Sequence, residues 1–405
     1  MQVTIRYGTN TINLTLPDQS SYDEFQCLPA GETATEQSFL TDIEVAEREL
    51  FPICEADLLV VNDAYRPTPT AQILSWLKNN GRLNPDAKIL VATGCHQPPT
   101  AEQMHVILGN LHDQLHRRVI VHDARNREIM VRVGDEVDGQ PVCLNRHFND
   151  ARRPVLIGSV EPHYFAGFTG GRKSVFPGLC DFETTARNHG LAVSFDAAPM
   201  RLKSNPVAEG LDNLMDLIAG RPLFGIQIVS TAEIGLQAVM CGELKDAFKR
   251  ACTQSRRIFG NEVDRQYDLI LAEVLPPLDS NLYQLQKSLE NCQAAVRDGG
   301  AIILFSPCRE GIGSQDFYRL AERWKTEGAA KLKDAFGVHK LFRVDKIGRR
   351  LDVFLYSMLD EGVAEYVFYN SIRDPQRIVN RMADKKRQMS IALVHDAGHT
   401  VLTVQ

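Results

Sequence analysis

The sequence predicts an α/β protein built from two α/β domains with mostly parallel sheets. Short runs of branched apolar residues alternate with segments of helical spacing, which is the pattern of strands joined by crossover helices. This pattern occurs in the first half of the chain and restarts near residue 268. A chain of 405 residues is also long for a single hydrophobic core, so more than one domain is expected.

The N-terminal segment predicts a β-hairpin. Apolar and polar residues alternate in VTIRYG at 3–8 and in TINLTL at 11–16. The turn-forming residues Gly8, Thr9 and Asn10 lie where the two runs meet. Alternation over a short run indicates a strand with one buried face, and glycine and asparagine favour a tight turn.

The next segments predict a parallel sheet with helices. Helices are expected over about residues 71–77 and 100–108, where apolar residues have helical spacing. Pro67 and Pro69 precede the first of them, and the fixed φ angle of proline suits a helix start. Three apolar runs indicate buried strands, at residues 56–61, 88–92 and 154–158.

The second α/β series lies in the last third of the chain. Residues 268–272 and 301–305 predict strands, and residues 282–296 between them predict an amphipathic helix. Gly299 and Gly300 interrupt the helical pattern before the second strand begins.

The polar stretch at 260–266 is interpreted as a hinge between the two series. We therefore expect an N-terminal domain at 1–259 and a smaller C-terminal domain at 267–385. The tail from about 386 to 405 is expected to pack back on the first domain.

Composition excludes several classes of protein. The net charge of −6 argues against a nucleic-acid partner, because phosphate binding needs a basic surface. No apolar run approaches the roughly 20 residues that span a bilayer, and the first residues lack a signal pattern. Nine cysteines are scattered singly, which is typical of reduced thiols. We expect a cytoplasmic protein without a membrane partner.

Reactive side chains follow the predicted strands at the point where each strand ends. Arg66 follows the first strand, His96 the second, and His163 and Lys173 the third. Ligands of open α/β sheets bind at the carboxyl ends of strands, so these residues are expected to share one site. Arginine suits a carboxylate, and histidine suits proton transfer near neutral pH. The pattern indicates proton transfer on a small acid.

Two motifs have alternative interpretations. Residues 167–174 nearly match a phosphate-binding loop, but Arg172 stands where that pattern requires glycine. The backbone amides of this loop are still able to cradle one phosphate. His112 and His116 have the spacing of a zinc-protease helix, but Asp113 replaces the required glutamate, which favours a surface pair.

Five motifs together resemble the nickel-pincer lactate racemase family, and the longest is highly specific. They are DAYRPTP at 63–69, TGCHQPP at 93–99, EPHYFAGFTGGRKSVFPG at 161–178, RNHG at 187–190 and YQLQK at 283–287. They occur in the family's order and fall in both expected domains. The resemblance implies two α/β domains with an active site in the cleft between them.

The resemblance also implies individual roles. Lys173 matches the lysine that carries the cofactor, a nickel-bound pyridinium-3-thioamide-5-thiocarboxylic acid mononucleotide, and His189 matches the protein ligand to nickel. His96 and His163 match the acid/base pair. The substrate would be held by Arg66, Gln284 and Lys287, and the residues near the cofactor would be Asp63, Tyr283, Gly170 and Gly171. Gln284 and Lys287 are three residues apart and share a helix face.

The implied reaction is racemisation or epimerisation at C2 of a 2-hydroxy acid, lactate or a larger acid, through hydride transfer. Cofactor maturation enzymes are implied partners, and the oligomeric state is left open. Neighbours of the matched residues that would shape the substrate pocket are Tyr65, Cys95, Tyr164 and Phe165. Two alternatives remain, a dehydrogenase-like protein and a non-catalytic 2-hydroxy-acid-binding protein; for the former, no G-x-G-x-x-G follows a strand.

Overall fold

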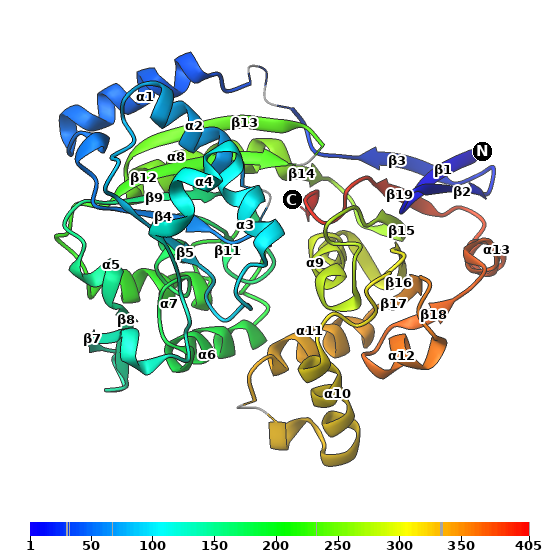
Figure 1. The fold of residues 1–405 in the computed structure, drawn as a ribbon. Coiled ribbons are helices and arrows are strands. Elements are labelled where there is room, and N and C mark those ends of the chain that lie inside the picture. Colours follow the sequence, from blue (N-terminus) through cyan, green and yellow to red (C-terminus); the bar gives the residue numbers. More distant parts are fainter. Residues whose placement is uncertain (30, 32, 67, 232, 333–334, 405) are drawn as a thin grey trace. The chain divides into compact units, whose positions relative to one another are not determined.

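The structure is a computed structural model that describes residues 1–29, 31, 33–66, 68–231, 233–332 and 335–404. Pro67, expected near a helix start, lies outside the described residues. The chain forms two compact α/β units (Figure 1). The first unit contains residues 1–28, 192–199 and 259–405, and the second contains residues 29–191 and 200–258.

The second unit contains a six-stranded sheet in the order β13-β12-β9-β4-β5-β6. All neighbouring pairs are parallel except β12 and β13. The strands are β4 Leu58–Asn62, β5 Lys88–Ala92, β6 Val119–Val121, β9 Pro154–Ser159, β12 Phe224–Thr231 and β13 Gly235–Glu243.

Helices cover both faces of this sheet. On one face, alternate strand residues such as Val61, Val91 and Ile157 pack against α1 Glu36–Glu49 and α2 Thr70–Asn79. Helices α6 and α7 lie on the opposite side (Figure 1). The other elements are α3 Ala101–Leu108, α4 His112–Leu115, β7 Met130–Asp135, β8 Pro141–Asn145, α5 Arg146–Asp150, β10 Pro162–His163, β11 Gly167–Phe168, α6 Phe182–Gly190, α7 Pro206–Asp216 and α8 Leu244–Phe259.

The first unit contains a six-stranded, fully parallel sheet in the order β18-β17-β16-β15-β19-β3. The strands are β3 Ser21–Phe25, β15 Tyr267–Glu273, β16 Val296–Phe305, β17 Asp352–Tyr356, β18 Asn370–Ile372 and β19 Ser390–Val394. The helices are α9 Leu282–Cys292, α10 Gln315–Glu327, α11 Val338–Gly348, α12 Glu361–Tyr366 and α13 Pro375–Lys385. β14 Gly260–Val263 pairs with β20 Val401–Val404 in a separate ladder.

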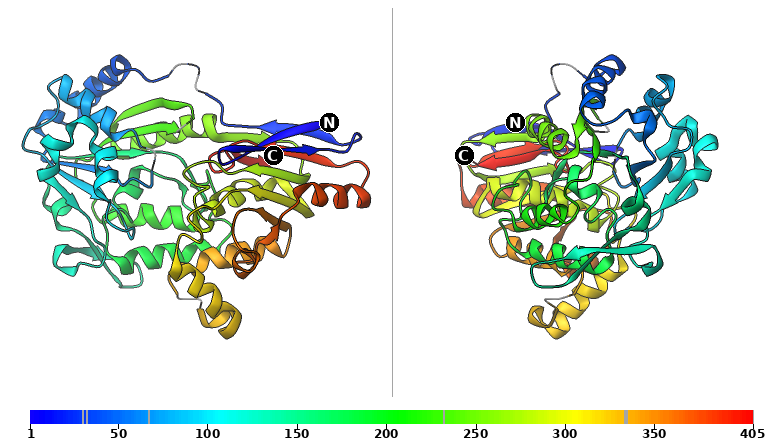
Figure 2. Two further views of the ribbon diagram at one scale, coloured as in Figure 1. Left: turned by 45° about the vertical axis from the view of Figure 1, so that its right-hand side comes forward. Right: turned by 90° about the vertical axis from the view of Figure 1, so that its left-hand side faces the viewer.

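Alternate residues of the strands in the first unit point to opposite faces of the sheet, so its hydrophobic core has two parts. Ile270 and Ile302 point to the side covered by α9, α10 and α11. Leu271 and Ile303 point to the other side, where they pack against α13 and the hairpin of β1 Gln2–Tyr7 and β2 Asn10–Thr15. Figure 2 shows the blue hairpin lying along the sheet that contains the red strand β19.

The predicted elements correspond to those of the structure. The expected α/β class with mostly parallel sheets is confirmed. The hairpin is antiparallel with Tyr7 opposite Asn10, and the run at 88–92 forms β5 as expected. The helix expected at 282–296 is shorter, because α9 ends at Cys292 and a 3-10 turn follows.

The expected domain boundaries differ from the two units. Residues 1–28 belong with residues 259–405, because β3 extends the sheet of the first unit by pairing with β19. The tail from 386 contributes β19 to the interior of the same sheet, so it does not join the expected N-terminal domain. The unit boundary at 258/259 lies beside the proposed hinge at 260–266, of which residues 260–263 form β14 and pair with β20.

Two further expectations concern the environment of the chain. No helix of the described residues has the length and apolar character that crossing a membrane demands. All nine cysteines lie within the described residues and none forms a disulfide. Five of them are buried, and burial raises the pKa of the Cys180, Cys292 and Cys308 thiols.

A buried carboxylate joins three strands of the first unit. Glu273, at the end of β15, is fully buried. It accepts hydrogen bonds from the backbone and Nε of Arg6 in β1 at 2.7 and 2.8 Å, and from Nδ1 of His395 after β19 at 2.9 Å. Burial alone would raise the pKa of Glu273, but the bonds from His395 and Arg6 outweigh it and hold that pKa below its ordinary value. The bond to Glu273 in turn raises the pKa of His395.

We expect Glu273→Gln to lower the free energy of unfolding by roughly 3 kcal/mol at pH 6, because it breaks a buried ion pair. The contribution of Glu273 is lost as pH falls below its ordinary pKa of 4.5. The contribution of His395 to stability is fully present below its ordinary pKa of 6.5 and is lost as pH rises through its raised pKa in the folded protein. The loss of stability caused by Glu273→Gln should therefore be smaller at pH 9 than at pH 6.

Urea denaturation at pH 6 and pH 9 measures the free energy of unfolding of the wild type and of Glu273→Gln. Asp298→Asn, which removes an ion pair whose carboxylate is 84% exposed, is the matched control and should change stability by less than about 0.5 kcal/mol. An equal loss in the two variants would contradict the role given to Glu273.

Candidate active site

Three adjacent parallel strands of the second unit end at one edge of its sheet. The strand order places β4 between β9 and β5. Asp63 follows β4, His96 lies four residues after β5, and His163 lies four residues after β9. Because parallel strands share a direction, their carboxyl ends deliver these side chains to the same edge. The expected grouping of the three strand ends is therefore present in the topology.

Asp63 and His96 form a short hydrogen-bonded pair. The Asp63 carboxylate is 5% exposed and its Oδ2 lies 2.6 Å from Nδ1 of His96. A carboxylate only accepts, so Nδ1 of His96 carries the proton and donates it. In neutral His96 the lone pair then lies on Nε2, and the ring is half exposed. Asp63 thus fixes His96 in the tautomer that accepts a proton at Nε2.

His163 has the opposite tautomer. It lies on β10, which forms a two-stranded turn with β11 in which His163 is opposite Gly167. Its Nδ1 accepts hydrogen bonds from the backbone N–H of Ala166 at 3.2 Å and of Phe165 at 3.5 Å. Neutral His163 therefore carries its proton on Nε2. One predicted histidine is set to accept at Nε2 and the other to donate there.

Arg66 is oriented by a buried acid that the sequence had not singled out. Nη1 of Arg66 lies 3.9 Å from Oε2 of Glu161, which is 4% exposed. This distance exceeds a hydrogen bond, so the pair orients the guanidinium without saturating its donors. Oε1 of Glu161 has no hydrogen-bond partner within the described part of the chain. Glu161 is part of the long motif, but only its burial beside Arg66 identifies a role.

Lys173 lies in a tightly packed 3-10 turn, Gly171–Ser174. Gly170 and Gly171 have φ angles of +72° and +51°, which favour glycine. The amide of Gly171 donates to Oε1 of Gln227 at 2.6 Å, and that of Lys173 donates to the Gly170 carbonyl at 2.9 Å. Two amides of the loop are therefore engaged within the protein, which argues against the phosphate cradle considered from the sequence.

Arg172 explains why the loop departs from the phosphate-binding pattern. Its side chain is 6% exposed, with Nε 3.1 Å from Oδ1 of Asp212 and the guanidinium 5.0 Å from the centre of the Phe248 ring. Arg172 therefore holds the turn against α7 and α8. The arginine is a structural anchor.

Phe165 brings three predicted residues together. Its ring centre lies 4.4 Å from that of His163 and 5.0 Å from that of His189, both edge-on. Nζ of Lys173 lies 5.7 Å from the same ring centre. The sequence suggested Phe165 only as a neighbour of the substrate pocket. The structure makes it the common contact of an acid/base candidate, a metal-ligand candidate and the candidate attachment lysine.

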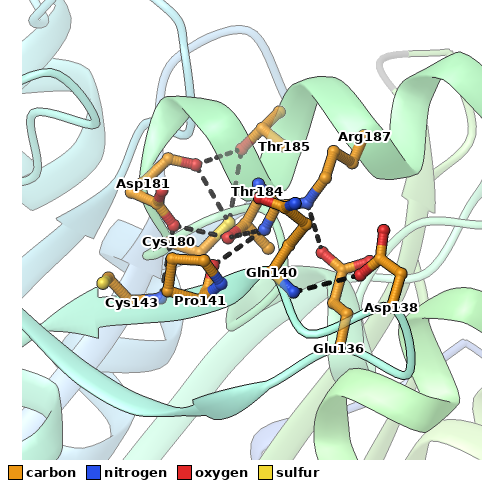
Figure 3. A network of polar contacts seen from close by, with 10 residues as sticks. All are labelled: Glu136, Asp138, Gln140, Pro141, Cys143, Cys180, Asp181, Thr184, Thr185 and Arg187. Carbon is orange, nitrogen blue, oxygen red and sulfur yellow. Dashed lines mark hydrogen bonds and ion pairs between the residues drawn. The ribbon is translucent and has the colours of Figure 1, made fainter.

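The helix that carries His189 is anchored by a polar network (Figure 3). Arg187 donates from Nε to Glu136 at 2.7 Å and from Nη2 to the Pro141 carbonyl at 2.8 Å. Oδ1 of Asp181, at the start of α6, accepts from the Thr184 hydroxyl at 2.6 Å and from the amide of Cys143 at 3.3 Å. These contacts fasten α6 to the β7–β8 hairpin, so Arg187 of the RNHG motif anchors the helix that carries His189.

Two buried polar atoms beside the turn that contains Lys173 lack a hydrogen-bond partner among the described residues. They are Asn62 Oδ1 and Ser174 Oγ. A Cβ at Gly158 would lie 2.9 Å from Asn62 Oδ1 and 3.1 Å from Ser174 Oγ, so Gly158 lies against both. Buried polar atoms are normally satisfied by protein, water or a ligand, which gives this region capacity for a polar group.

The described residues contain no cluster of three or more His, Cys, Asp or Glu side chains able to hold a metal ion. His189 would then be a single protein ligand. A metal bound to it would take its other ligands from a non-protein group.

The remaining predicted residues lie at the start of α9 in the first unit. Asn281 accepts from the Gln284 amide at 3.0 Å and so fixes the first turn. Tyr283, Gln284 and Lys287 follow within that turn and the next, and all three are partly exposed. Sequence reasoning missed Lys340 of α11, whose ammonium group lies 3.7 Å from the Tyr283 ring centre. The sequence did contain a signal for its burial, because Lys340 lies four and seven residues before Val344 and Ile347, which are buried on the same helix face.

Two family models match the chain. Residues 7–200 match the lactate racemase N-terminal domain, and residues 269–338 match the lactate racemase C-terminal domain. Together these matches cover more than half of the chain.

Curated relatives and solved structures agree with these models. A lactate racemase of Thermoanaerobacterium thermosaccharolyticum is 30% identical over 272 residues, which cover 65% of this chain and only 62% of that relative. A lactate racemase of Lactiplantibacillus plantarum is 26% identical over 334 residues, with 78% and 77% covered. The lactate racemase apoprotein structure from T. thermosaccharolyticum has a TM-score of 0.83 at 22% identity and 100% coverage of both chains. A Thermotoga maritima protein structure has a TM-score of 0.72 at 18% identity, covering 93% of this chain and 100% of the other.

We expect Gly171→Ala to destabilise the second unit by roughly 2–3 kcal/mol, from left-handed backbone strain and overpacking. A Cβ at this position would lie 2.5 Å from the Phe248 ring. Gly190→Ala is the matched control, because a Cβ there meets no atom within 4 Å, and its effect should stay within about 0.5 kcal/mol. Urea denaturation of both variants measures the difference, and similar midpoints would refute the packing argument.

Proposed function

The chain belongs to the lactate racemase family, and on this basis we propose that it is an isomerase that inverts C2 of a 2-hydroxy acid. The observation that carries the proposal is the pair of opposed tautomers. His96 is set by Asp63 to accept a proton at Nε2, and His163 is set by the amides of residues 165 and 166 to carry one there. A racemase must handle the hydroxyl proton of either enantiomer, and two differently prepared histidines suit that need.

His96 takes the hydroxyl proton of one enantiomer in this proposal. The Asp63 carboxylate, 2.6 Å from Nδ1, stabilises the imidazolium that results. His163 handles the oxygen of the opposite enantiomer, with its burial and two backbone bonds holding the ring in place. Each histidine is base for one enantiomer and acid for the other.

The substrate carboxylate is assigned to Arg66, which Glu161 orients. Gln284 and Lys287 of α9 are proposed to hold the substrate as well, by amide hydrogen bonding and by charge. A small acid with a hydroxyl group at C2 is the substrate class that needs both a carboxylate clamp and the two histidines. Lactate is the proposed first substrate, and Tyr65, Cys95 and Tyr164 are the side chains proposed to tune the choice of acid.

The cofactor proposed is the nickel-pincer nucleotide, and the residues present fit it. Lys173 would hold it covalently, and His189 would complete the coordination of its nickel. The unpartnered atoms of Ser174 and Asn62 offer hydrogen bonds to a polar group beside Lys173. Asp63 and Tyr283 are proposed to lie near the nucleotide, and Gly170 and Gly171 to permit the turn that presents Lys173. When bound, the group supplies an acceptor that takes hydride from C2 and returns it.

Two alternatives use part of the same site. A dehydrogenase-like protein would retain Arg66 and one proton acceptor, and a 2-hydroxy-acid-binding protein would retain Arg66 alone. Neither explains two histidines held in opposite tautomers. Interconversion of pure D- and L-lactate by the nickel-loaded protein distinguishes the three, because only a racemase forms the opposite enantiomer without net oxidation.

We expect protein produced together with the cofactor maturation enzymes to contain stoichiometric nickel and a mass addition on the peptide that contains Lys173. Lys173→Ala should fold but lose the added mass, because the attachment amine is gone. Metal analysis and peptide mass spectrometry measure both. Active wild-type protein with an unmodified Lys173 would refute the attachment, and active protein without nickel would refute the cofactor.

We expect His96→Ala and His163→Ala, loaded with cofactor, to lose roughly a hundred- to ten-thousandfold in racemisation of both enantiomers, because a full turnover uses both histidines. His163→Asn provides a sharper control. Its side-chain oxygen retains an acceptor for the amides of residues 165 and 166 but lacks the Nε2 proton. It should therefore fold normally and remain inactive. Near wild-type rates in any of these variants would sink the two-histidine mechanism.

A further inference from the structure

A buried lysine contacts the helix turn that carries the proposed substrate-binding residues. Lys340, in α11, is 4% exposed. Its Nζ donates to the Tyr283 carbonyl at 3.1 Å and lies 3.7 Å from the centre of the Tyr283 ring. Taking an amine out of water is unfavourable, and an apolar residue of similar length would pack in this position without that penalty. A lysine here therefore calls for an explanation beyond packing.

The charged groups that face Lys340 include two side chains of α9, Glu290 and Lys287. Glu290 of α9 is held by Arg343 in a bidentate pair at 2.6 and 2.7 Å, and both side chains are almost completely buried. The second charge facing Lys340 from α9 is positive, that of Lys287. Burial and Lys287 lower the pKa of Lys340 to about 7, against the opposite effect of Glu290. Two amines thus lie near each other at one end of α9, and one of them titrates near neutrality.

Lys340 also fixes the orientation of Tyr283. The Tyr283 ring contacts the Lys340 ammonium group and also the Phe317 ring, whose centre is 5.4 Å away in an edge-to-face arrangement. The Tyr283 carbonyl, which accepts from Lys340, is by α-helix geometry also the acceptor for the amide of residue 287. A single ammonium group therefore contacts both the ring and the backbone of the turn from Tyr283 to Lys287.

We propose that Lys340 is a positioning residue for the reaction, holding the first turns of α9 so that Gln284 and Lys287 hold the anionic substrate. The inference rests on the proposed function. The positive charge of Lys340 adds to that of Lys287 and favours an anion at this end of the helix. Its contribution to substrate binding is present while the amine is protonated and falls as pH rises through 7.

The experiment compares Lys340→Met with Lys325→Met in the nickel-loaded full-length protein. Lys325 is the matched control, because it also lies over an aromatic ring, 3.8 Å from the centre of Tyr366, and faces a backbone carbonyl, but it is exposed. We measure KM and kcat for D- and L-lactate between pH 6 and 8.5, and the Tm of each variant between pH 6 and 9.

We expect Lys340→Met to raise KM about tenfold with less than about a threefold change in kcat, since binding rather than chemistry is affected. The wild-type KM should rise as pH increases through 7, and this rise should be absent in Lys340→Met. Lys325→Met should match the wild type. The ordinary pKa of lysine is 10.5, so the cost of burying the charge is fully present below pH 7 and relieved at higher pH. Lys340→Met should therefore raise Tm, and by more at pH 6 than at pH 9.

The outcomes separate the possibilities. An active Lys340→Met with a wild-type KM and an unchanged pH profile overturns the proposal. A fall in Tm that parallels the loss of activity makes Lys340 a structural contact between α9 and α11, which also overturns it. A nickel-loaded wild-type protein that interconverts no 2-hydroxy acid overturns the proposed function itself, and the role of Lys340 falls with it.

Discussion

Parallel pairing of β9, β4 and β5 is the constraint on which the candidate site depends. The hydrogen-bonded registers Val60 with Leu90 and Val60 with Leu156 align three strands in one direction. Their carboxyl ends must then meet at one edge, and the segments that follow carry Asp63, His96 and His163. No single motif produces this arrangement. It follows from the connections between the strands, because parallel neighbours need crossovers, which are right-handed and place helices on the faces of the sheet.

In each of the two histidines at this edge, the hydrogen bonds to Nδ1 decide whether Nε2 accepts or donates a proton. A carboxylate at Nδ1 prepares His96 to accept at Nε2, and backbone amides at Nδ1 prepare His163 to donate there. The same residue type thus acquires two chemical states, according to whether a carboxylate or backbone amides hydrogen-bond its Nδ1. Phe165 then contacts His163, His189 and Lys173 through its ring, so an apolar side chain brings polar groups together.

Buried charge occurs in this molecule in two forms. Glu273 and Glu290 are fully buried and paired, the first with Arg6 and His395 and the second with Arg343, and they join elements that are far apart in the chain. Glu161 and Lys340 are also buried, and they lie next to residues with proposed chemical roles. Buried pairs join elements of the fold, whereas a buried ionisable group beside a candidate site favours a functional role.

The sequence by itself determined the α/β class, most strands and helices, and which residues are proposed to carry the chemistry, because period-two and helical spacing and strand-end motifs are local signals. It did not determine which unit a segment joins. Residues 1–28 and the tail from 386 meet in one sheet only through pairing of β3 with β19, a contact between residues more than 350 positions apart. Likewise, the tautomers of His96 and His163, the acid behind Arg66 and the burial of Lys340 depend on neighbours that are remote in sequence or set by the folded turn. Tertiary structure decided these properties because electrostatics and burial are set by what surrounds a side chain in space.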